Sequence, residues 1–386
     1  MLSNQKDLFN LPEDITYLNC SYMSPMLKSV AEVGVKSLYG KDDPTSVSPN
    51  DFFNNTSDLR TEFAKLINAH SERSCAVVPS VSYAMANVAK NLKAGKGDNI
   101  VIADEQFPSN VYAWKELEKE KGIQLKLVAP PQEAEERGKR WNELILETID
   151  AKTKMVSTGH VHWADGTLFD LVAIRKRADE VGAILVIDGT QSIGALPFDV
   201  QQFRPDAVVA AGYKWLMGPY ASGVAYYGEY FADGSPIENN WMNRLNSENF
   251  GGLVNYQDEY QDGSIRYEVG ESANFILTPM LTRAIQQVNE WTPAGIQEYL
   301  GNLTAPYLKE LEALDIQIEN NNYRGNHLYG LRLPEHINLE DVKANFAKNH
   351  VYVSIRGNSI RVSPHLYNAE KDLIQLVESL KSEVLA

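Results

Sequence analysis

The sequence predicts an α/β protein with a three-layer, mostly parallel seven-stranded sheet, followed by a smaller α+β C-terminal domain. Three observations support this. Seven short apolar runs recur between about residues 75 and 228, segments with helical features separate most of them, and the pattern changes after about residue 230. Runs that are apolar almost throughout indicate strands covered on both faces. The alternation of strand with helix indicates parallel strands joined by crossovers.

The seven apolar runs give the expected strands, and the segments between them give the helices. In order, the strands are 75–79, 99–104, 123–129, 154–161, 183–188, 206–213 and 223–228. The segment "YAMANVAKNLKAG" (83–95) is expected to be a helix closed by its glycine. The segment "FDLVAIRKRADEVG" (169–182) has apolar residues three and four apart and also ends on glycine, which favours the left-handed conformation at a helix end.

The last third of the chain has a different organisation. Residues 239–264 are polar, aromatic and rich in Gly and Asn, which is typical of a long functional loop. A long helix over about 278–301 and a set of shorter strands and helices are expected to follow. We therefore expect three parts: an arm over 1–30 that joins the small domain, a large domain over 31–275 and a small domain over 276–386.

Composition limits the classes of function. Asp and Glu outnumber Lys and Arg by 51 to 36, and the net charge is −15. This acidity argues against binding to nucleic acid or to an anionic membrane. The N-terminal stretch lacks the features of a signal peptide, and no apolar run is long enough to span a membrane. The two cysteines have no zinc-binding spacing, and we expect a soluble cytoplasmic protein.

Polar side chains stand at the ends of three expected strands. "AILVID" ends on Asp188, with Gln191 shortly after, and "DAVVAAGY" is followed by Lys214. The third strand end, in "KMVSTGHVHW", carries His160, His162 and Trp163. Ligands of open α/β sheets bind outside the carboxyl ends of the strands. Asp188 and Lys214 are one β-α-β crossover apart, so both side chains can reach the same edge of the sheet.

An amine and a carboxylate at a sheet edge suit pyridoxal phosphate (PLP) chemistry. Burial lowers the pKa of a lysine toward its nucleophilic form, and Lys214 would form a Schiff base with the cofactor aldehyde. Asp188 would pair with the pyridinium nitrogen and Gln191 with the ring hydroxyl. The alternative is a structural ion pair between Lys214 and Asp188.

Two further segments offer groups for such a cofactor. Ser80 and Ser82 stand where the first expected strand turns into a helix, and free N–H groups at a helix N-terminus bind anions. The alternative is that these serines only cap the helix. Phe107 follows another strand and could stack on a ring, or it could be a core residue.

Two segments that contain Asp188, Gln191 and Lys214 resemble a known protein family. "VIDGTQSIGALPFDV" (186–200) and "AGYKWLMGPYASGVAYY" (211–227) resemble the signature of class V aminotransferases, a fold-type I PLP-dependent group that includes cysteine desulfurases, kynureninase and isopenicillin N epimerase-like proteins. The resemblance runs from "YLNCSYMSP" to "IRVSPHLYNAEKDL". It implies that the cofactor is held by Ser80, Val81, Ser82, Phe107, Asp188, Gln191, Tyr213 and Lys214. Lys214 and Asp188 would carry the catalysis.

The resemblance also implies the substrate contacts. "IRVSPHLYN" matches a family pattern in which Arg361 clamps the substrate carboxylate, and Arg356 is a second candidate. Trp163 would cover the substrate side of the pocket, with His162 lining it. Asn249, in "ENFGGLVNY", would reach into the active site of a partner subunit, which implies a homodimer.

The chain departs from the family pattern in two places. It has no cysteine beyond residue 75, so sulfur transfer through the persulfide cysteine of the desulfurases is not expected. Glu271 stands where relatives have a threonine that reaches the phosphate of the neighbouring subunit. Ser272 is the candidate that would take over this phosphate contact.

Other readings stay open. His160 and His162 could be a pair of metal ligands, but the sequence lacks the adjacent Asp-His of the metallo-hydrolase motif, so it favours packing and pocket lining, and we expect no metal. No G-x-G-x-x-G or Walker A pattern supports a nicotinamide or nucleotide enzyme. The expected activity is that of an aminotransferase. The alternatives are a lyase of the kynureninase or C–S type, an amino-acid epimerase, or a catalytically silent cofactor-binding protein.

Overall fold

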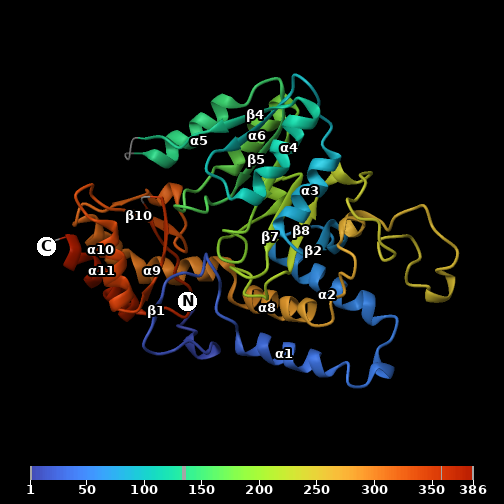
Figure 1. The fold of residues 1–386 in the computed structure, drawn as a ribbon, viewed down its shortest axis with the longest axis horizontal. Helices are drawn as coiled ribbons and strands as arrows, with labels where there is room; N and C mark the ends of the chain where they lie inside the picture. Colours follow the sequence, from blue (N-terminus) through green and yellow to red (C-terminus); the bar gives the residue numbers. More distant parts are fainter. Residues whose placement is uncertain (1, 133–135, 358, 385–386) are drawn as a thin grey trace.

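The large sheet has seven strands, and all but one of them run parallel (Figure 1). The computed structural model describes residues 2–132, 136–357 and 359–384. The strands are β2 (Cys75–Val78), β3 (Asn99–Ala103), β4 (Gln124–Val128), β5 (Thr153–Gly159), β6 (Ile184–Asp188), β7 (Ala207–Ala211) and β8 (Gly223–Tyr227). Their order is β2-β8-β7-β6-β5-β3-β4, and β8 is antiparallel to both neighbours. All seven expected strands are confirmed.

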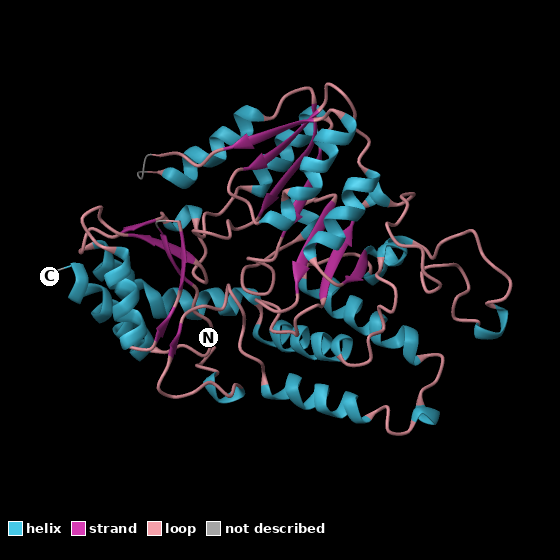
Figure 2. Ribbon diagram, viewed as in Figure 1, coloured by secondary structure: helices cyan, strands magenta, loops and turns pink. Residues whose placement is uncertain are grey.

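Successive side chains of the strands point to opposite faces of the large sheet, and helices cover both faces. The sheet and its two helical coverings are the three layers. Leu185 and Ile187 pack into one cluster with α2 (Asp51–Leu66), α5 (Arg137–Thr148), α6 (Leu171–Val181) and α8 (Leu277–Trp291). Ile184 and Val186 pack into the other cluster with α3 (Val81–Asn91) and α4 (Tyr112–Lys121). Strands covered on both faces in this way explain the nearly continuous apolar runs of the sequence. The helices on either side of the sheet are visible in Figure 2.

One expected helix end is confirmed, one differs from the structure, and one expected helix is divided into two. α6 ends at Gly182, which adopts a left-handed conformation with φ 72°, as predicted. α3 ends earlier than predicted, because Leu92 after Asn91 is already extended and Gly95 lies beyond the helix. The single helix expected over 278–301 is wrong. It is two helices, α8 and α9 (Pro293–Glu312), because Pro293 has no N–H and begins a new helix that Thr292 caps.

The smaller unit has an antiparallel four-stranded sheet of its own. Its strands are β9 (Gln317–Ile318), β10 (Tyr329–Arg332), β12 (Ser354–Arg356) and β13 (Ser359–Val362), in the order β12-β13-β10-β9. Helices α9, α10 (Leu339–Lys348) and α11 (Glu370–Val384) cover it. The remaining helices are α1 (Lys28–Tyr39) and α7 (Val200–Phe203).

The N-terminal arm pairs with the smaller unit. β1 (Thr16–Tyr17) is parallel to β11 (Val351–Tyr352), and Asn19 forms a bridge to Ser363. Leu18 is fully buried in the apolar cluster of the small unit. These contacts support the expected attachment of the arm, while the boundaries at residues 30 and 275 stay a prediction.

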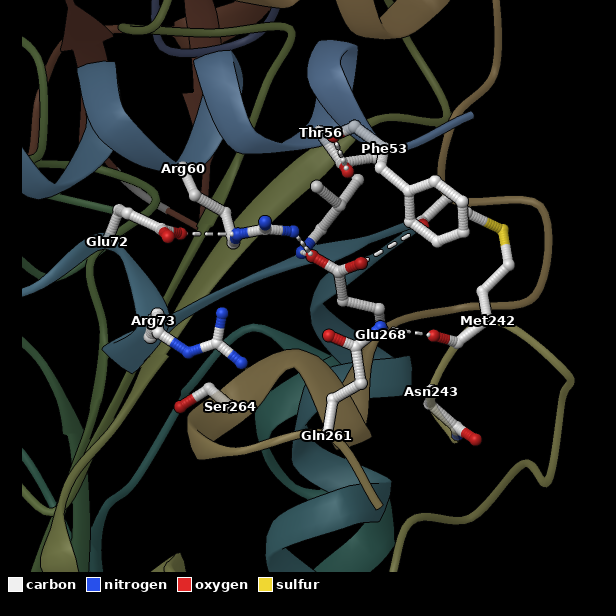
Figure 3. A network of polar contacts seen from close by, with 12 residues as sticks. Phe53, Thr56, Arg60, Glu72, Arg73, Met242, Asn243, Gln261, Ser264 and Glu268 are labelled. Atoms are coloured by element: carbon white, nitrogen blue, oxygen red, sulfur yellow. Dashed lines mark hydrogen bonds and ion pairs between the residues drawn. The ribbon is translucent and has the colours of Figure 1, made fainter. Parts of the chain in front are cut away.

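A buried ionic network joins α2 to the segment before α8 (Figure 3). The Arg60 guanidinium contacts Glu268 and Glu72, each at 2.8 Å. Glu268 also accepts hydrogen bonds from the backbone N–H of Val77 at 3.2 Å and from the Ser272 hydroxyl at 3.0 Å. One carboxylate therefore holds β2, α2 and residues 268–272 together.

The loop over 239–264 projects away from the sheets, where it is yellow in Figure 1. Tyr256 is 95% exposed and Val254 is 80% exposed. Among the residues that the structure describes, no helix combines the length and the apolar character that a membrane span needs.

Candidate active site

A cavity of about 390 Å³ lies at the carboxyl ends of the parallel strands. Residues at or after the ends of β2, β3, β5, β6 and β7 line it, together with residues just before β8. They are Pro79, Ser80, Val81, Gln106, Phe107, Ser109, Gly159, Val161, Trp163, Asp188, Thr190, Gln191, Ala211, Tyr213, Lys214, Tyr220, Ala221 and Ser222. β8 runs antiparallel, so it begins at the edge where its neighbours end. The topology thus brings together five segments that are far apart in the sequence, because the residues after β7 and before β8 belong to one connection.

Lys214 stands on a tight turn between β7 and β8 that is anchored in the core. Trp215, Leu216 and Met217 after it are fully buried. Within the turn, the Met217 N–H donates to the Lys214 carbonyl at 3.0 Å, and the Gly218 N–H donates to the Gly212 carbonyl at 2.8 Å. This anchoring directs the lysine toward the cavity while the next three side chains fill the interior.

The surroundings of Lys214 lower the pKa of its amine. The side chain is only 6% exposed, and burial lowers its pKa to about 8. The nearby Arg361 and Arg356 guanidinium groups also lower the pKa, and Asp188 opposes them. The Nζ atom lies 5.5 Å from the ring centroids of Phe107 and Tyr213. Among the described residues no carboxylate comes within ion-pair distance of Nζ, so the structure does not show the alternative Lys214–Asp188 ion pair.

Asp188 is the last residue of β6 and is buried in the cavity wall. Burial raises the pKa of its carboxyl group, while hydrogen bonds from Thr190 and the charge of Lys214 oppose the rise. The Thr190 N–H donates to Asp188 Oδ1 at 3.0 Å. A buried carboxylate without a paired cation suits a protonated ring nitrogen.

Gln191 also lines the cavity, and three neighbours hold it in place. Trp215 Nε1 donates to Gln191 Oε1 at 3.0 Å, and Gln191 Nε2 donates to the Ser21 carbonyl at 3.1 Å. His327 Nε2 lies 2.8 Å from its backbone oxygen. The turn after Lys214, the N-terminal arm and the small unit therefore meet at this residue.

The predicted phosphate turn lies at the start of α3. Ser80 is the N-cap, and its hydroxyl accepts a hydrogen bond from the Tyr83 N–H at 3.2 Å. Ser82 is exposed and does not line the cavity itself. The hydroxyl oxygens of Ser80 and Ser82 are 3.0 Å apart. Ser80 and Val81 do line the cavity. The first N–H groups of a helix have no partner within the helix, and they attract anions.

Aromatic rings form one side of the site. Phe107 is 36% exposed and packs edge to face against Trp163, with ring centroids 5.4 Å apart. Its exposure excludes the alternative of a core phenylalanine. Tyr213 and Tyr220 have ring centroids 4.7 Å apart, and both line the cavity. These rings offer faces on which a flat cofactor can stack.

A second cavity of about 360 Å³ adjoins the first and carries the predicted substrate arginines. It shares Phe107, Trp163, Tyr213, Lys214 and Tyr220 with the first cavity and adds Ser21, Tyr22, Met23, Arg356 and Arg361. Arg361 is 1% exposed, and burial and the neighbouring Arg356 lower the pKa of its guanidinium to about 9. Its Nη1 donates to the Trp163 carbonyl at 2.6 Å.

Besides Ser82, three of the predicted residues do not line these cavities. His162 is buried outside both cavities, where its ring contacts the Asp165 carboxylate and the Glu105 carbonyl, each at 3.1 Å. The Ser272 hydroxyl is turned to Glu268. Asn249 lies on the projecting loop, where its side chain accepts a hydrogen bond from the Gly252 N–H at 3.2 Å.

The histidine pair that could have bound a metal is divided between two environments. The His160 ring packs against Phe198 and Phe203, whereas His162 faces Asp165. In the described parts of the chain, no group of three or more His, Cys, Asp or Glu side chains is placed to hold a metal ion.

Sequence reasoning missed several residues of the cavity walls: Gln106, Thr190, Tyr220, Ser222 and Tyr22. Thr190 could have been found, because it stands between Asp188 and Gln191 in the same turn. Tyr22 could not, since it reaches the site only because the arm binds the distant Ser363, whose hydroxyl lies 2.8 Å from that of Ser21.

The residues around the first cavity fit PLP. They include a buried amine of lowered pKa, a buried carboxylate, a helix N-terminus with a serine cap and an exposed aromatic face. The volume of about 390 Å³ lies in the usual range of cofactor sites.

Comparison with known proteins agrees with this description. An uncharacterized aminotransferase of Bacillus subtilis (strain 168), YcbU, is 25% identical over 339 residues, which are 86% of this chain and 84% of the relative. The cysteine desulfurase CsdA of Escherichia coli has a TM-score of 0.80 at 16% identity, covering 98% of this chain and 97% of that one. The cystine C–S lyase C-DES, in complex with its product cysteine persulfide, has a TM-score of 0.83 at 18% identity, covering 95% and 97%. These two likenesses show the fold.

The sequence matches the family described as "Aminotransferase class-V" over residues 45–376, which is most of the chain. The chain therefore belongs to the class-V aminotransferase family of PLP-dependent enzymes.

Proposed function

We propose that the protein is an amino-acid aminotransferase in which Lys214 carries the cofactor. The observation that carries this proposal is the placement of Lys214 and Asp188 on the wall of one cavity, with an amine whose pKa is lowered to about 8. When bound, PLP supplies an aldehyde for a Schiff base and a protonated ring that withdraws electrons from the substrate.

Each residue then has a role that follows from its position. Asp188 holds the proton on the ring nitrogen, and Gln191 contacts the ring oxygen. With PLP bound and its own amine free, Lys214 Nζ would accept the proton from the substrate α-carbon and deliver it to the carbon that carried the cofactor aldehyde, as a general acid–base group whose pKa is lowered to about 8.

Other residues in and around the two cavities bind the cofactor and the substrate. Ser80, Ser82 and the N-terminus of α3 bind the phosphate, with Tyr213 as a further contact. Phe107 stacks on the ring. Arg361 binds the substrate carboxylate as a bidentate donor, because burial and its Trp163 contact hold the guanidinium in place.

Lyase chemistry is the second candidate, because a cystine C–S lyase and a cysteine desulfurase share the fold. This chain has no exposed cysteine that could carry a persulfide in a desulfurase reaction. Both cysteines, Cys20 and Cys75, are buried, and burial raises the pKa of each thiol. A lyase reaction of this protein would therefore have to run on the cofactor alone.

We also propose a cytoplasmic homodimer with the projecting loop at the subunit interface. The exposed side chains of Val254 and Tyr256 on that loop support it. Ser272, held by Glu268, would then stand near the phosphate of the neighbouring subunit. Analytical ultracentrifugation tests the dimer, and a monomer at micromolar concentration overturns it.

Two experiments test the enzymatic proposal. Borohydride reduction of the cofactor-loaded protein and peptide mapping should place the adduct on Lys214, and an unmodified Lys214 refutes the assignment. A screen of amino acids with and without a keto-acid acceptor then separates the reactions. Transamination makes a keto acid only with the acceptor, a lyase releases ammonia or sulfide without it, and an epimerase changes only chirality. No spectral change with any amino acid indicates a silent cofactor-binding protein.

A further inference from the structure

We infer that the substrate is an amino acid with a second acidic group on its side chain, and that Arg356 binds this group while Arg361 binds the α-carboxylate. The inference rests on the proposed function, because it takes the α-carboxylate to lie at Arg361. It names the class of substrate for the same site.

The register of the small sheet places the two arginines on one face. β12 and β13 are antiparallel, with Ser354 opposite Arg361 and Arg356 opposite Ser359. Side chains two residues apart on a strand point to the same side, so Arg356 lies on the same side as Ser354 and therefore as Arg361. Diagonal neighbours of this kind have side chains within reach of one ligand.

Trp163 and the second cavity show that the two guanidinium groups face the same space. Arg356 Cζ lies 5.5 Å from the Trp163 ring centroid, and Arg361 Cζ lies 6.0 Å from it. Both arginines line the second cavity together with Lys214. A small molecule attached at Lys214 therefore lies within the cavity that both arginines line.

The charges around this space do not balance. Lys214, Arg356 and Arg361 line the two adjoining cavities, and Asp188 is the only acidic residue among the described residues that do so. No carboxylate lies within ion-pair distance of either arginine in the described parts of the chain. Like charges on neighbouring strands destabilise a sheet, so two unpaired arginines here favour bound anions.

Both arginines retain free donors. Arg361 is 1% exposed, and its Nε has no partner among the described residues. Its Nη1 donates to the Trp163 carbonyl, and its Nη2 donates to the Ser354 hydroxyl at 3.3 Å. Arg356 is half-buried, and its one hydrogen bond within the described chain goes from Nη1 to the adjacent Ile355 carbonyl at 2.8 Å. One substrate carboxylate occupies the guanidinium of one arginine, and the guanidinium of the other arginine then remains for a second acidic group.

The test compares acids with their uncharged amides. Cofactor-loaded protein is assayed with L-aspartate against L-asparagine and with L-glutamate against L-glutamine, and L-cysteine sulfinate serves as an arm that separates a sulfinate from a carboxylate. We expect kcat/KM to favour the acids by ~10- to 100-fold, the contribution of one charge-assisted hydrogen-bonded pair. Arg356→Gln should reduce this ratio to within about threefold of unity, and Arg356→Lys should keep part of it, because the lysine retains the charge without the fork. Arg140→Gln, an exposed arginine of α5, is the matched control and should leave the ratio unchanged.

Binding without turnover gives an independent readout. Maleate and glutarate carry two carboxylates and no amine, and butyrate carries one carboxylate. Calorimetry on the cofactor-loaded protein should show the dicarboxylates binding at least ~10-fold more tightly than butyrate, and Arg356→Gln should remove the difference.

Three outcomes overturn the inference. Amides that react as well as acids in the unmodified protein show that the side-chain pocket does not select charge. An Arg356→Gln variant that loses acids and amides equally shows that Arg356 serves the α-carboxylate or the fold. In both cases the proposed function stands, since the amino acids still react. If no amino acid changes the cofactor spectrum, the proposed function falls and the inference falls with it.

Discussion

Arg361 of β13 donates a 2.6 Å hydrogen bond to the backbone oxygen of Trp163, which follows β5 of the large sheet. A second link runs alongside, because Arg332 of β10 contacts the Asp165 carboxylate at 2.9 Å. The small sheet is thus fastened to the loop that covers the cofactor cavity. The position of the substrate arginine relative to Lys214 follows from these two contacts.

Arg361→Lys should lower kcat/KM by about 10- to 100-fold, mainly through a higher KM. A lysine retains the positive charge but cannot donate to a carboxylate and to the Trp163 carbonyl with one rigid fork. Steady-state kinetics measures the effect, and circular dichroism verifies that the variant is folded. A variant with an unchanged KM would show that the α-carboxylate binds elsewhere.

Lys214→Met should stabilise the cofactor-free protein by about 3 kcal/mol at pH 7, because the fold lowers the lysine pKa from 10.5 to about 8. The unmodified protein then retains the proton more weakly when folded than when unfolded. Its unfolding free energy should therefore rise with pH between about 8 and 10.5, and the advantage of the variant should disappear over this range. Urea unfolding at several pH values measures it. Parallel pH profiles for the two proteins would contradict the assignment.

Asp188→Asn should bind the cofactor but turn over amino acids at least ~100-fold more slowly. A neutral amide cannot stabilise a proton on the ring nitrogen, whereas Asp188→Glu keeps the charge and should retain more activity. Absorbance spectra report cofactor binding, and single-turnover rates report the chemistry. Equal rates for the Asn variant and the unmodified protein would remove Asp188 from the mechanism.

Glu268→Gln should destabilise the protein by about 3 kcal/mol, because it leaves the buried Arg60 with a weaker partner. Glu72→Gln is the matched control on the same arginine. The Glu72 side chain is 28% exposed and that of Glu268 is 5% exposed, so the control should cost about 1 kcal/mol or less. Thermal unfolding of both variants measures the difference. Equal losses would show that burial does not set the strength of this network.

The fold class and the seven strands could be predicted, because a covered strand imposes its apolar pattern on a few adjacent residues. The family could be predicted from the motifs around Asp188 and Lys214. The break between α8 and α9 was also visible in Pro293 and was missed. Lys214, Asp188 and Gln191 could be proposed because each stands at or just after the end of an expected parallel strand, whereas Arg361 could be proposed only from the family pattern.

The remaining parts of the site depend on contacts across the chain. Tyr22 is brought to the cavity by pairing between the arm and residues more than 300 positions later. The orientation of His162 is set by a carboxylate three residues away and by a carbonyl of another loop. Neither arrangement leaves a local pattern, so the sequence alone placed His162 at the cavity and left Tyr22 out.

The pairing of β1 with β11 also constrains the order of events during synthesis. Thr16 leaves the ribosome more than 300 residues before its partner Val351 is synthesised. Until then the arm has no strand to join, and the cavity lacks the wall that Ser21, Tyr22 and Met23 provide. Because closing so long a loop is slow, completion of the substrate cavity is a late folding event that cannot precede the synthesis of Val351. A nascent chain therefore carries the cofactor lysine well before it can hold a substrate.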